Sequence, residues 1–356
     1  MNQALNTPDD YERLERLNMI RDSAAAVVPR DGDLSRIRAL RFTAPHALRG
    51  PWQALCEQGW TGLSLAEARG GSGLGQAESI ALLEELGRGL APEPLIDATL
   101  AAALLPADLL AAQLSGTHLT LPAGLHQRAS VQYRDGAVSG ELHDVALGAC
   151  ADAFVLNTDH GLALVDVRAG GVEIQQAATQ DGGHNTRLKF TQAPGRLLDM
   201  SAATLQQALD QATLGTAAYL LGCMQSAFER TLDYLKVRRQ FGHAIGSFQA
   251  LQHRCVDLKL QIELSRAIIT QAAVRIDEGI AADARQRQVS AAKLRSSRAA
   301  LQVCREAIQL HGAIGYTDEA DIGLFLRKAL VLINSGGTLE QHQARYIHQV
   351  FAEVQA

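Results

Sequence analysis

The feature that most constrains the fold is a set of long segments, from about residue 200 to the end, that repeat apolar or small side chains at steps of three and four. The first spans about residues 202–237 and follows Ser201, a good N-cap residue. The stripes of the second and third lie at Leu251, Cys255, Leu258, Ile262, Ser265 and Ile269, and at Leu294, Ser297, Leu301, Cys304 and Ile308. Such stripes predict an antiparallel helical bundle.

The beginning of the chain, to about residue 115, also has a helical pattern. One helical face is formed by Ile80, Leu83, Leu86 and Leu90, and the pattern ends before Pro92 and Pro94. Glycines at positions 70, 71, 73 and 75 precede this helix. They lack the G-x-G-x-x-G spacing, a preceding strand and a following Lys-Ser/Thr pair. They therefore predict a turn and not a phosphate-binding loop.

Between Thr117 and about Arg196 the pattern changes to short alternating runs, which are typical of β-strands. Asp135-Gly136 and Asp159-His160-Gly161 are expected to form hairpin turns between such strands. The sequence thus predicts three domains. These are a helical domain over residues 1–116, a small β-domain over 117–198 and a helical bundle over 199–356.

Composition excludes several classes of function. The chain has 356 residues, 47% of them hydrophobic, and a formal net charge of −5, which gives no indication of nucleic-acid or phospholipid binding. Its five cysteines are scattered, with no C-x-x-C pair, so neither a disulfide framework nor a zinc site is predicted. No signal peptide and no apolar run long enough to span a bilayer are found, and a cytoplasmic protein is predicted.

Two glycine turns near the C-terminus bracket a short amphipathic segment and are expected to form the wall of a site. The first contains Gly312 and Gly315, and the second contains Gly336 and Gly337. Glycine is used where the backbone takes a positive φ or lies close to a ligand. Polar residues flank both turns, and His311 is expected to pack at the first one. A related stretch, RRQFGHAIGSFQALQH, covers residues 238–253.

These stretches resemble the C-terminal domain of the acyl-CoA dehydrogenase family. The family pattern of Arg-x-x-Phe-Gly, Phe-Gln, Gln-x-x-Gly-(Gly/Ala)-x-Gly-(Tyr/Phe) and Gly-Thr is matched at Arg238, Phe241, Gly242, Gln249, Gln309, Gly312, Gly315, Tyr316, Gly337 and Thr338. The order GW-x-G-L, glycine turn, EELGR resembles its N-terminal domain. The resemblance implies a mainly α fold with an N-terminal helical domain, a middle β-barrel-like domain and a C-terminal four-helix bundle.

The resemblance also implies FAD-dependent dehydrogenation of an acyl-CoA, for which a carboxylate must remove the α-proton while the flavin takes the β-hydride. The family places this Glu just before the Gly-Thr pair or on the first long helix of the C-terminal domain. Those positions hold Gly336 and Ala212, neither of which can take a proton. Asp210 points about 200° away from the second position on a helix. Glu340 is the best alternative base, although a surface role is expected for it.

The middle domain also departs from the family pattern, in the residues that hold the flavin ring. The family holds its own flavin ring with a Thr-Glu-Pro-x-x-Gly-Ser-Asp loop and a later Trp-containing strand. The corresponding place here reads THLTLPAGL, and no Trp follows Trp60. Either replacement contacts have evolved, or the flavin-ring cradle of this subunit is absent.

The matched residues are those that the family contributes across a dimer interface to the neighbour's FAD. A cationic fork at Arg238 suits a phosphate, and Phe241 gives an apolar surface. Gln309, together with the backbone at Gly312 and Ala313, can form hydrogen bonds with a nucleotide. The predicted FAD-binding residues are Arg238, Gln240, Phe241, Gln249, Gln309, Gly312, Ala313 and Thr338. No catalytic residue and no metal site are predicted.

The leading hypothesis is therefore the non-catalytic partner subunit of a heteromeric (α2β2) bacterial acyl-CoA dehydrogenase. The resemblance implies a homologous catalytic subunit, a steroid side-chain acyl-CoA as a possible substrate and an electron-transfer flavoprotein as acceptor. A second hypothesis is a self-sufficient homomeric dehydrogenase with a relocated base, Glu340. A third is a binding or scaffold homologue without turnover.

Overall fold

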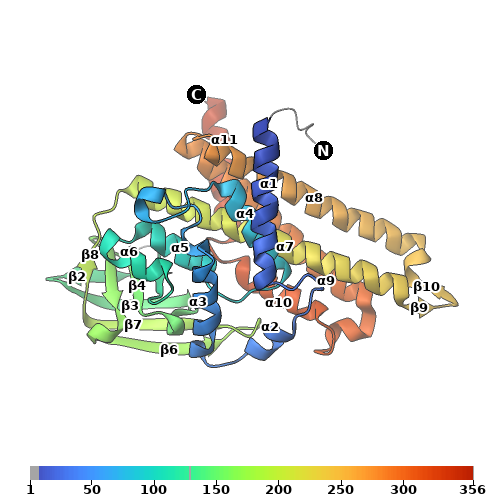
Figure 1. Ribbon diagram of the computed structural model, residues 1–356, viewed down its shortest axis with the longest axis horizontal. Helices are drawn as coiled ribbons and strands as arrows, with labels where there is room; N and C mark the ends of the chain where they lie inside the picture. The colour runs from blue at the N-terminus through green and yellow to red at the C-terminus, as the bar shows by residue number, and fades with distance from the viewer. Residues whose placement is uncertain (1–7, 128–129, 356) are drawn as a thin grey trace. The chain divides into compact units, whose positions relative to one another are not determined.

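The computed structural model describes residues 8–127 and 130–355, which form two compact units (Figure 1). One unit, called the helical unit, contains the described residues up to 34, residues 75–91 and those from 214 onward. The other, called the sheet unit, contains residues 35–74 and 92–213. The three-domain division predicted from the sequence stays a prediction, because these units cut the chain at other places.

The helical unit consists mainly of long helices whose apolar stripes face one another. Its α-helices are α1 (Pro8–Ser23), α4 (Gln76–Arg88), most of α7 (Ala202–Val237), α8 (Gln249–Asp277), α9 (Ala282–His311), α10 (Ile322–Leu332) and α11 (Leu339–Gln355). The predicted stripe of α8 is buried at Cys255, Leu258, Ile262, Ser265 and Ile269. The sequence prediction of a helical bundle in this part of the chain is confirmed.

Helices α4 and α7 approach closely because two glycines lie between them. A Cβ atom on Gly222 of α7 would lie 1.9 Å from the carbonyl oxygen of Glu84. One on Gly87 of α4 would lie 2.1 Å from the carbonyl oxygen of Tyr219. The Tyr219 hydroxyl donates a hydrogen bond to the Ala91 carbonyl at 2.8 Å. Since neither glycine can accept a side chain without moving a backbone, the two helices fit only in this arrangement.

A side chain at the end of α8 caps the beginning of α4. The first turn of a helix leaves backbone N–H groups without intrahelical partners. The Asp277 carboxylate accepts hydrogen bonds from the backbone N–H of Gln76 at 2.7 Å and from that of Ala77 at 3.1 Å. Gly75 provides the space that this carboxylate occupies, because a Cβ atom there would lie 2.6 Å from an Asp277 oxygen.

We expect Asp277→Ala to lower the free energy of unfolding by about 1–2 kcal/mol, because both N–H groups of the α4 cap lose their acceptor. Urea unfolding followed by circular dichroism measures this change. Glu278→Ala is the matched control, since that neighbouring carboxylate meets only the exposed Arg275 at 3.6 Å. Equal stability of the two variants would contradict the capping role.

The sheet unit combines short helices with one sheet of eight strands. Its α-helices are α2 (Ser35–Leu40), α3 (Arg49–Glu57), α5 (Leu95–Leu104), α6 (Ala107–Leu114) and the beginning of α7. The strands are β1 (Thr120–Ala123), β2 (Val131–Arg134), β3 (Ala137–Ala146), β4 (Ala153–Thr158), β5 (Gly161–Asp166), β6 (Val172–Ala178), β7 (His184–Pro194) and β8 (Arg196–Leu197). Their order is β6-β7-β3-β2-β4-β5-β8, and β1 pairs in parallel with β4.

Both predicted hairpin turns are confirmed. Asp135 and Gly136 have φ values of 48° and 80° and join β2 to β3, as in a type I′ turn. Asp159 and His160 join β4 to β5, with Thr158 paired to Gly161. Local turn chemistry alone was enough to place these two connections.

Candidate functional site

The first part of the candidate site is a hairpin between α7 and α8. Strand β9 (Arg239–Gln240) pairs antiparallel with β10 (His243–Ala244), and Phe241-Gly242 forms the turn (Figure 1). Both turn residues have positive φ values, 53° for Phe241 and 81° for Gly242. Glycine adopts this conformation freely, whereas a bulky residue such as Phe rarely does.

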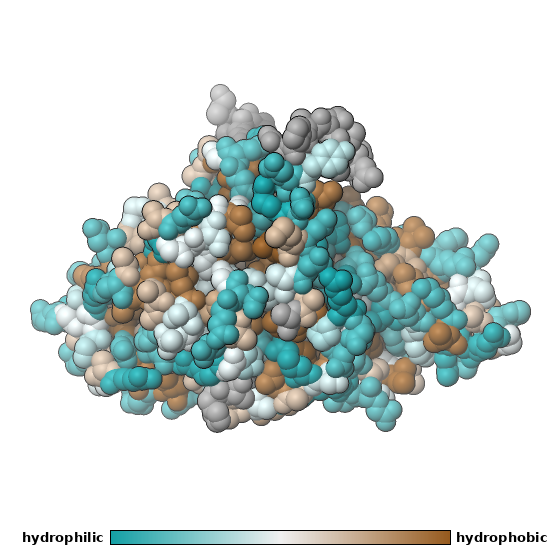
Figure 2. All heavy atoms as spheres, viewed as in Figure 1, coloured by the Kyte–Doolittle hydropathy of each residue, from teal (hydrophilic) through white to brown (hydrophobic). Residues whose placement is uncertain are grey.

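Phe241 is displayed to solvent. The residue is 87% exposed, and its ring packs edge-on against the ring of Phe248 with centroids 6.2 Å apart. The end of the molecule that carries β9 and β10 shows hydrophobic atoms among hydrophilic ones (Figure 2). A strained and exposed aromatic residue does nothing for the core, which favours a role in binding.

The charges on the hairpin are positive. Arg238 and Arg239 are exposed and form no ion pair within residues 8–127 and 130–355, whereas Lys236 pairs with Asp233 at 2.9 Å. The sequence contains no Asp or Glu from residue 234 to 256. Gln240 and Gln249 are exposed on the same stretch. Exposed guanidinium forks and amides of this kind suit an anionic ligand such as a diphosphate.

The second part of the candidate site is the turn at the end of α9. Gln309 and Ala313 are exposed, and the Tyr316 hydroxyl lies 3.5 Å from the side-chain oxygen of Gln309. Gly312 has φ 68° and ψ −143°, a conformation open only to glycine. The glycine is thus required by the backbone at this helix end, as the sequence predicted for the turn.

Two contacts bring the hairpin and the α9 turn to the same end of the helical unit. The ring of Tyr234, one helical turn before Arg238, stacks on His311 with centroids 4.4 Å apart. Arg254 in the second turn of α8 forms an ion pair with Glu306 of α9. Seven of the eight predicted residues, all except Thr338, therefore lie on these two adjoining segments. The role of His311 is packing, as expected, because its Nδ1 also meets the Ala307 carbonyl at 2.7 Å.

Thr338 lies elsewhere. It begins α11, where its hydroxyl oxygen accepts a hydrogen bond from the Gln341 N–H at 3.3 Å and its own N–H donates to the Gln341 side chain at 2.9 Å. This is a capping box. Its helix contacts α9 near Ser290, through His342, and not near Gln309. At 1.5 Å per residue, Ser290 and Gln309 are roughly 28 Å apart along α9.

The two positions at which the sequence analysis expects the family's base, Gly336 and Ala212, differ in their surroundings. Gly336 has a φ of 73°, in the left-handed region, so a side-chain-bearing residue would be strained there. Ala212 is partly buried against the apolar cluster that contains Leu100, Ala208 and Leu209. Both positions are built for small residues in this chain.

Two carboxylates, Asp210 and Glu340, lie near these positions in the sequence. Asp210 is 1% exposed, and its Oδ1 accepts a hydrogen bond from Gln206 at 2.8 Å. Glu340 is exposed at the start of α11, where its own backbone N–H and the Thr338 hydroxyl hold the pKa of its carboxyl below the ordinary value. A lowered pKa makes Glu340 a weaker base, because its carboxylate holds a proton less readily.

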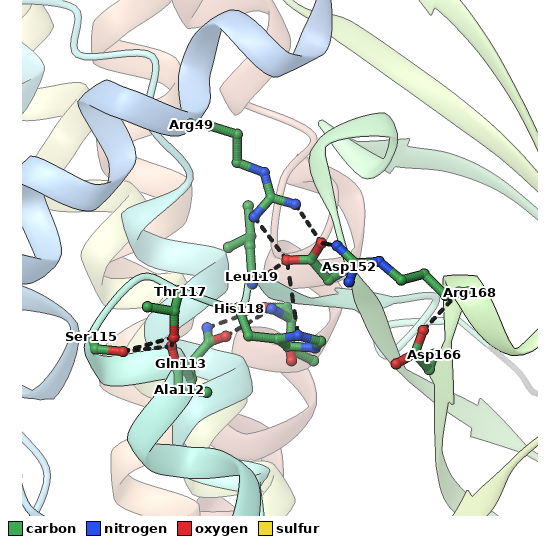
Figure 3. A network of polar contacts seen from close by, with 11 residues as sticks. Arg49, Ala112, Gln113, Ser115, Thr117, His118, Leu119, Asp152, Asp166 and Arg168 are labelled. Atoms are coloured by element: carbon green, nitrogen blue, oxygen red, sulfur yellow. Dashed lines mark hydrogen bonds and ion pairs between the residues drawn. The ribbon is translucent and has the colours of Figure 1, made fainter.

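The segment of residues 117–125, where the sequence analysis expects the family's flavin-ring loop, is tied into the sheet unit (Figure 3). The Thr120 N–H donates to the buried Gln113 side chain at 2.7 Å, and the Leu119 N–H donates to Asp152 at 2.8 Å. Asp152 also receives two hydrogen bonds from Arg49, at 2.8 and 2.7 Å. Although burial raises the pKa of Asp152, the Arg49 guanidinium and the Leu119 N–H together with His118 outweigh it and hold that pKa below its ordinary value. These groups anchor the segment to α3 and α6.

Comparisons with known proteins identify the class. Residues 15–106 match the model of the acyl-CoA dehydrogenase N-terminal domain, and residues 202–351 match that of the C-terminal domain. Acyl-CoA dehydrogenase IpdE2 of Mycobacterium tuberculosis is 31% identical over 318 residues, which cover 88% of this chain and 91% of that protein. The chain belongs to the acyl-CoA dehydrogenase family.

Solved structures agree with this assignment. A steroid ACAD G363A variant designated Tcur3481-Tcur3483 has a TM-score of 0.87 and 27% identity, covering 96% of this chain and 99% of its own. The ChsE4-ChsE5 complex from Mycobacterium tuberculosis has a TM-score of 0.81 and 24% identity, and the match covers 98% of this chain and 99% of the matched chain. The predicted fold class, mainly α with a sheet and a helical C-terminal part, is confirmed.

FAD is the cofactor of this family, whose members are flavin-dependent oxidoreductases. The residues of the hairpin and the α9 turn are chemically suited to the diphosphate and nucleotide portion of FAD. The exposed Arg238 guanidinium, which forms no ion pair within the described residues, suits the diphosphate, Phe241 offers an apolar face, and the amides of Gln240, Gln249 and Gln309 can serve polar groups of a nucleotide. The assignment of individual residues to FAD stays a prediction. No helix in the described part of the chain is long and apolar enough to cross a membrane.

Proposed function

We propose that this chain is the non-catalytic subunit of a heteromeric acyl-CoA dehydrogenase and completes the FAD site of a homologous catalytic subunit. One observation carries the proposal. The hairpin displays a strained, solvent-exposed Phe241 beside an Arg238 without a partner in the described chain, whereas the base position holds Gly336 at a positive φ. The chain thus has residues that can reach the cofactor of a neighbouring subunit, Arg238 and Phe241, but no carboxylate at position 336 to remove the α-proton.

In the proposed complex each part of the site has a separate task. When bound, FAD accepts the hydride removed from the acyl-CoA. Arg238 would hold a phosphate of this cofactor through its guanidinium fork, and Phe241 would cover an apolar part of it. Gln309 and the Gly312–Ala313 backbone would fix its orientation by hydrogen bonds. The catalytic subunit would supply the base.

The substrate class and partners follow as further parts of the proposal. A neighbour in structure is a steroid ACAD, so a CoA thioester of a steroid side chain is the proposed substrate. The ChsE4-ChsE5 complex, which shares the fold, supports an assembly of unlike chains, for which we propose an α2β2 stoichiometry. An electron-transfer flavoprotein is the proposed acceptor, because the family uses one.

The test is the flavin content and mass of the chain, purified alone and then co-expressed with an acyl-CoA dehydrogenase encoded by a neighbouring gene. We expect a colourless protein alone, and a yellow complex of unlike chains with one FAD for each pair. A yellow homo-oligomer that oxidises acyl-CoA by itself would overturn the proposal and favour Glu340 as the base. A complex without flavin and without turnover would favour a scaffold.

Restoring the carboxylate should not restore catalysis. We expect Gly336→Glu, purified without a partner, to show no acyl-CoA oxidation, although a positioned base is worth about 10²–10⁴ in rate. The left-handed backbone opposes the new side chain at a cost of about 1–2 kcal/mol. The readout is reduction of an artificial electron acceptor, with Gly323→Glu on α10 as a control for the added charge. Turnover by Gly336→Glu alone would mean that this chain holds a complete flavin site.

A further inference from the structure

The hairpin between α7 and α8 projects into solvent. All residues from 236 to 243 are exposed, and Figure 1 shows β9 and β10 beyond the end of α7. The hairpin is closed at its base, where the Ile245 N–H donates a hydrogen bond to the Arg238 carbonyl at 2.8 Å. The position of the hairpin relative to the rest of the helical unit therefore depends on what its base contacts.

The base of the hairpin lies on the last turn of α7. The Arg238 N–H donates to the Tyr234 carbonyl at 2.9 Å, which continues the helical pattern of hydrogen bonds to the first residue of the hairpin. Gly246 packs against the same turn, because a Cβ atom there would lie 2.9 Å from the Leu235 carbonyl oxygen. The orientation of the hairpin thus follows from that of the end of α7.

The α9 turn is likewise built on the last turn of its helix. A Cβ atom on Gly315 would lie 2.6 Å from the Ile308 carbonyl oxygen and 3.0 Å from the His311 Cβ, so the turn folds back onto α9. With its proton on Nδ1, the His311 imidazole donates to the Ala307 carbonyl at 2.7 Å, which fixes the orientation of the ring. Burial lowers the pKa of His311, so the ring is neutral at pH 7.

An aromatic contact joins the base of the hairpin to the base of the α9 turn. The rings of Tyr234 and His311 stack with centroids 4.4 Å apart and an angle of 20° between their planes. The ion pair of Arg254 with Glu306 also joins the two helices, but its side chains are 39% and 35% exposed. Exposed ion pairs contribute little because water screens them, whereas stacked rings stabilise a structure beyond the area they bury. The stack is therefore the stronger of these two links.

We propose that Tyr234 and His311 are positioning residues, whose stack fixes the spacing of the hairpin and the α9 turn so that the two segments act as one binding surface. This inference rests on the proposed function, in which both segments serve one cofactor of a neighbouring subunit. Arg238 follows α7 whereas Gln309 belongs to α9, so a ligand that meets both needs these two helix ends at a fixed spacing. Fixing the spacing in advance lowers the entropy lost on binding.

The first measurement is amide hydrogen exchange in the chain alone. One reporter is the Ile245 N–H at the base of the hairpin, and the other is the Thr317 N–H after the α9 turn, which donates to the Ile314 carbonyl at 3.1 Å. For Tyr234→Leu and for His311→Leu we expect exchange about three- to tenfold faster at both reporters, because the stacked pair is lost. Faster exchange only at the reporter nearer to the substitution would overturn the inference.

Three further variants separate the stack from general effects on the fold. Tyr234→Phe keeps the ring and should exchange like the wild type, and Tyr346→Leu, which removes an exposed ring from α11, should also leave both reporters unchanged. Arg254→Met removes the ion pair with Glu306 and should change exchange less than Tyr234→Leu does. An effect of Arg254→Met as large as that of Tyr234→Leu would mean that the stack is not what joins the two segments.

The second measurement is FAD retention in the co-expressed complex, by flavin fluorescence after dilution. We expect Tyr234→Leu to release flavin about three- to tenfold faster and Tyr234→Phe to retain it. Gln309→Ala should cause a smaller loss in the Tyr234→Leu background than in the wild type, because Gln309 is then no longer held in place. Additive losses would overturn the inference. If the wild-type pair itself binds no FAD, the proposed function fails, whereas hydrogen exchange in the chain alone still tests the stack, so the two failures are distinguishable.

Discussion

Arg238→Ala is expected to weaken FAD retention in the assembled complex by about 10- to 100-fold, the range for losing a charge-assisted, bidentate contact to phosphate. The fold of the chain should not change, because the guanidinium has no ion pair within the described residues and is exposed. Flavin fluorescence released on dilution of the complex measures the retention, and circular dichroism of the variant alone measures the fold.

Arg239→Ala provides the matched control for Arg238→Ala. The two residues are adjacent, exposed and equally charged, but successive side chains of an extended segment point to opposite sides. If Arg238 holds the cofactor, Arg239→Ala should change FAD retention only through the general loss of one positive charge. Full flavin occupancy in the Arg238→Ala complex, or equal losses in both variants, would show that Arg238 is not a specific phosphate ligand.

The second large effect is expected for stability. Gly222→Ala should lower the free energy of unfolding by about 3 kcal/mol or more, or prevent soluble expression. The new methyl group would lie 1.9 Å from the carbonyl oxygen of Glu84 and 2.8 Å from the backbone nitrogen of Arg88. Both obstacles are backbone atoms of α4, so a rotamer change cannot relieve them, and overpacking of a core commonly costs about 1–3 kcal/mol even where side chains can move.

Gly323→Ala distinguishes this packing effect from the ordinary effect of adding a methyl group to a helix. Gly323 lies in α10, where the nearest atom to an added Cβ is 3.9 Å away. Alanine is favoured over glycine within a helix by about 0.5–1 kcal/mol, so this variant should be neutral or slightly more stable. The check is the urea midpoint of both variants. A Gly222→Ala midpoint close to that of Gly323→Ala would mean that α4 and α7 do not depend on the glycine contact.

The proposed absence of a base at position 336 agrees with the conformation of the turn that contains Gly336. A missing carboxylate could be the result of a single substitution on an otherwise complete site. Here the backbone at that position is left-handed, and the carbonyl of Gly336 faces the buried His342. A positive φ favours glycine at this position, which supports the proposal that the chain does not use it for proton transfer.

Much of the fold could be predicted from local sequence. The helix over residues 202–237 and the stripe of α8 follow from spacings of three and four, because an amphipathic helix must bury the same face along its length. The Asp135-Gly136 turn follows from residues that tolerate positive φ. The lack of a carboxylate at Gly336 and Ala212 is also a property of the sequence alone.

The site residues could be predicted in part. The motif at Arg238 and Phe241 identified the hairpin, but not that Phe241 is strained or almost fully exposed. The buried polar contacts of Lys293 and His342 were not predicted, although Ser290, Lys293 and Ser297 share one helical face. That pattern could not name their partners, which are backbone carbonyls about 40 residues away for Lys293.

The sequence by itself determined the helices and the hairpin turns, because these depend on residues close together in the chain. Only the tertiary structure decided which distant residues share a surface. The stacking of Tyr234 on His311 joins the hairpin to the α9 turn, whereas the α9 helix separates both from Thr338. The physical reason is that such contacts depend on how whole helices pack, and the periodicity of one helix does not specify the side chains of its neighbour.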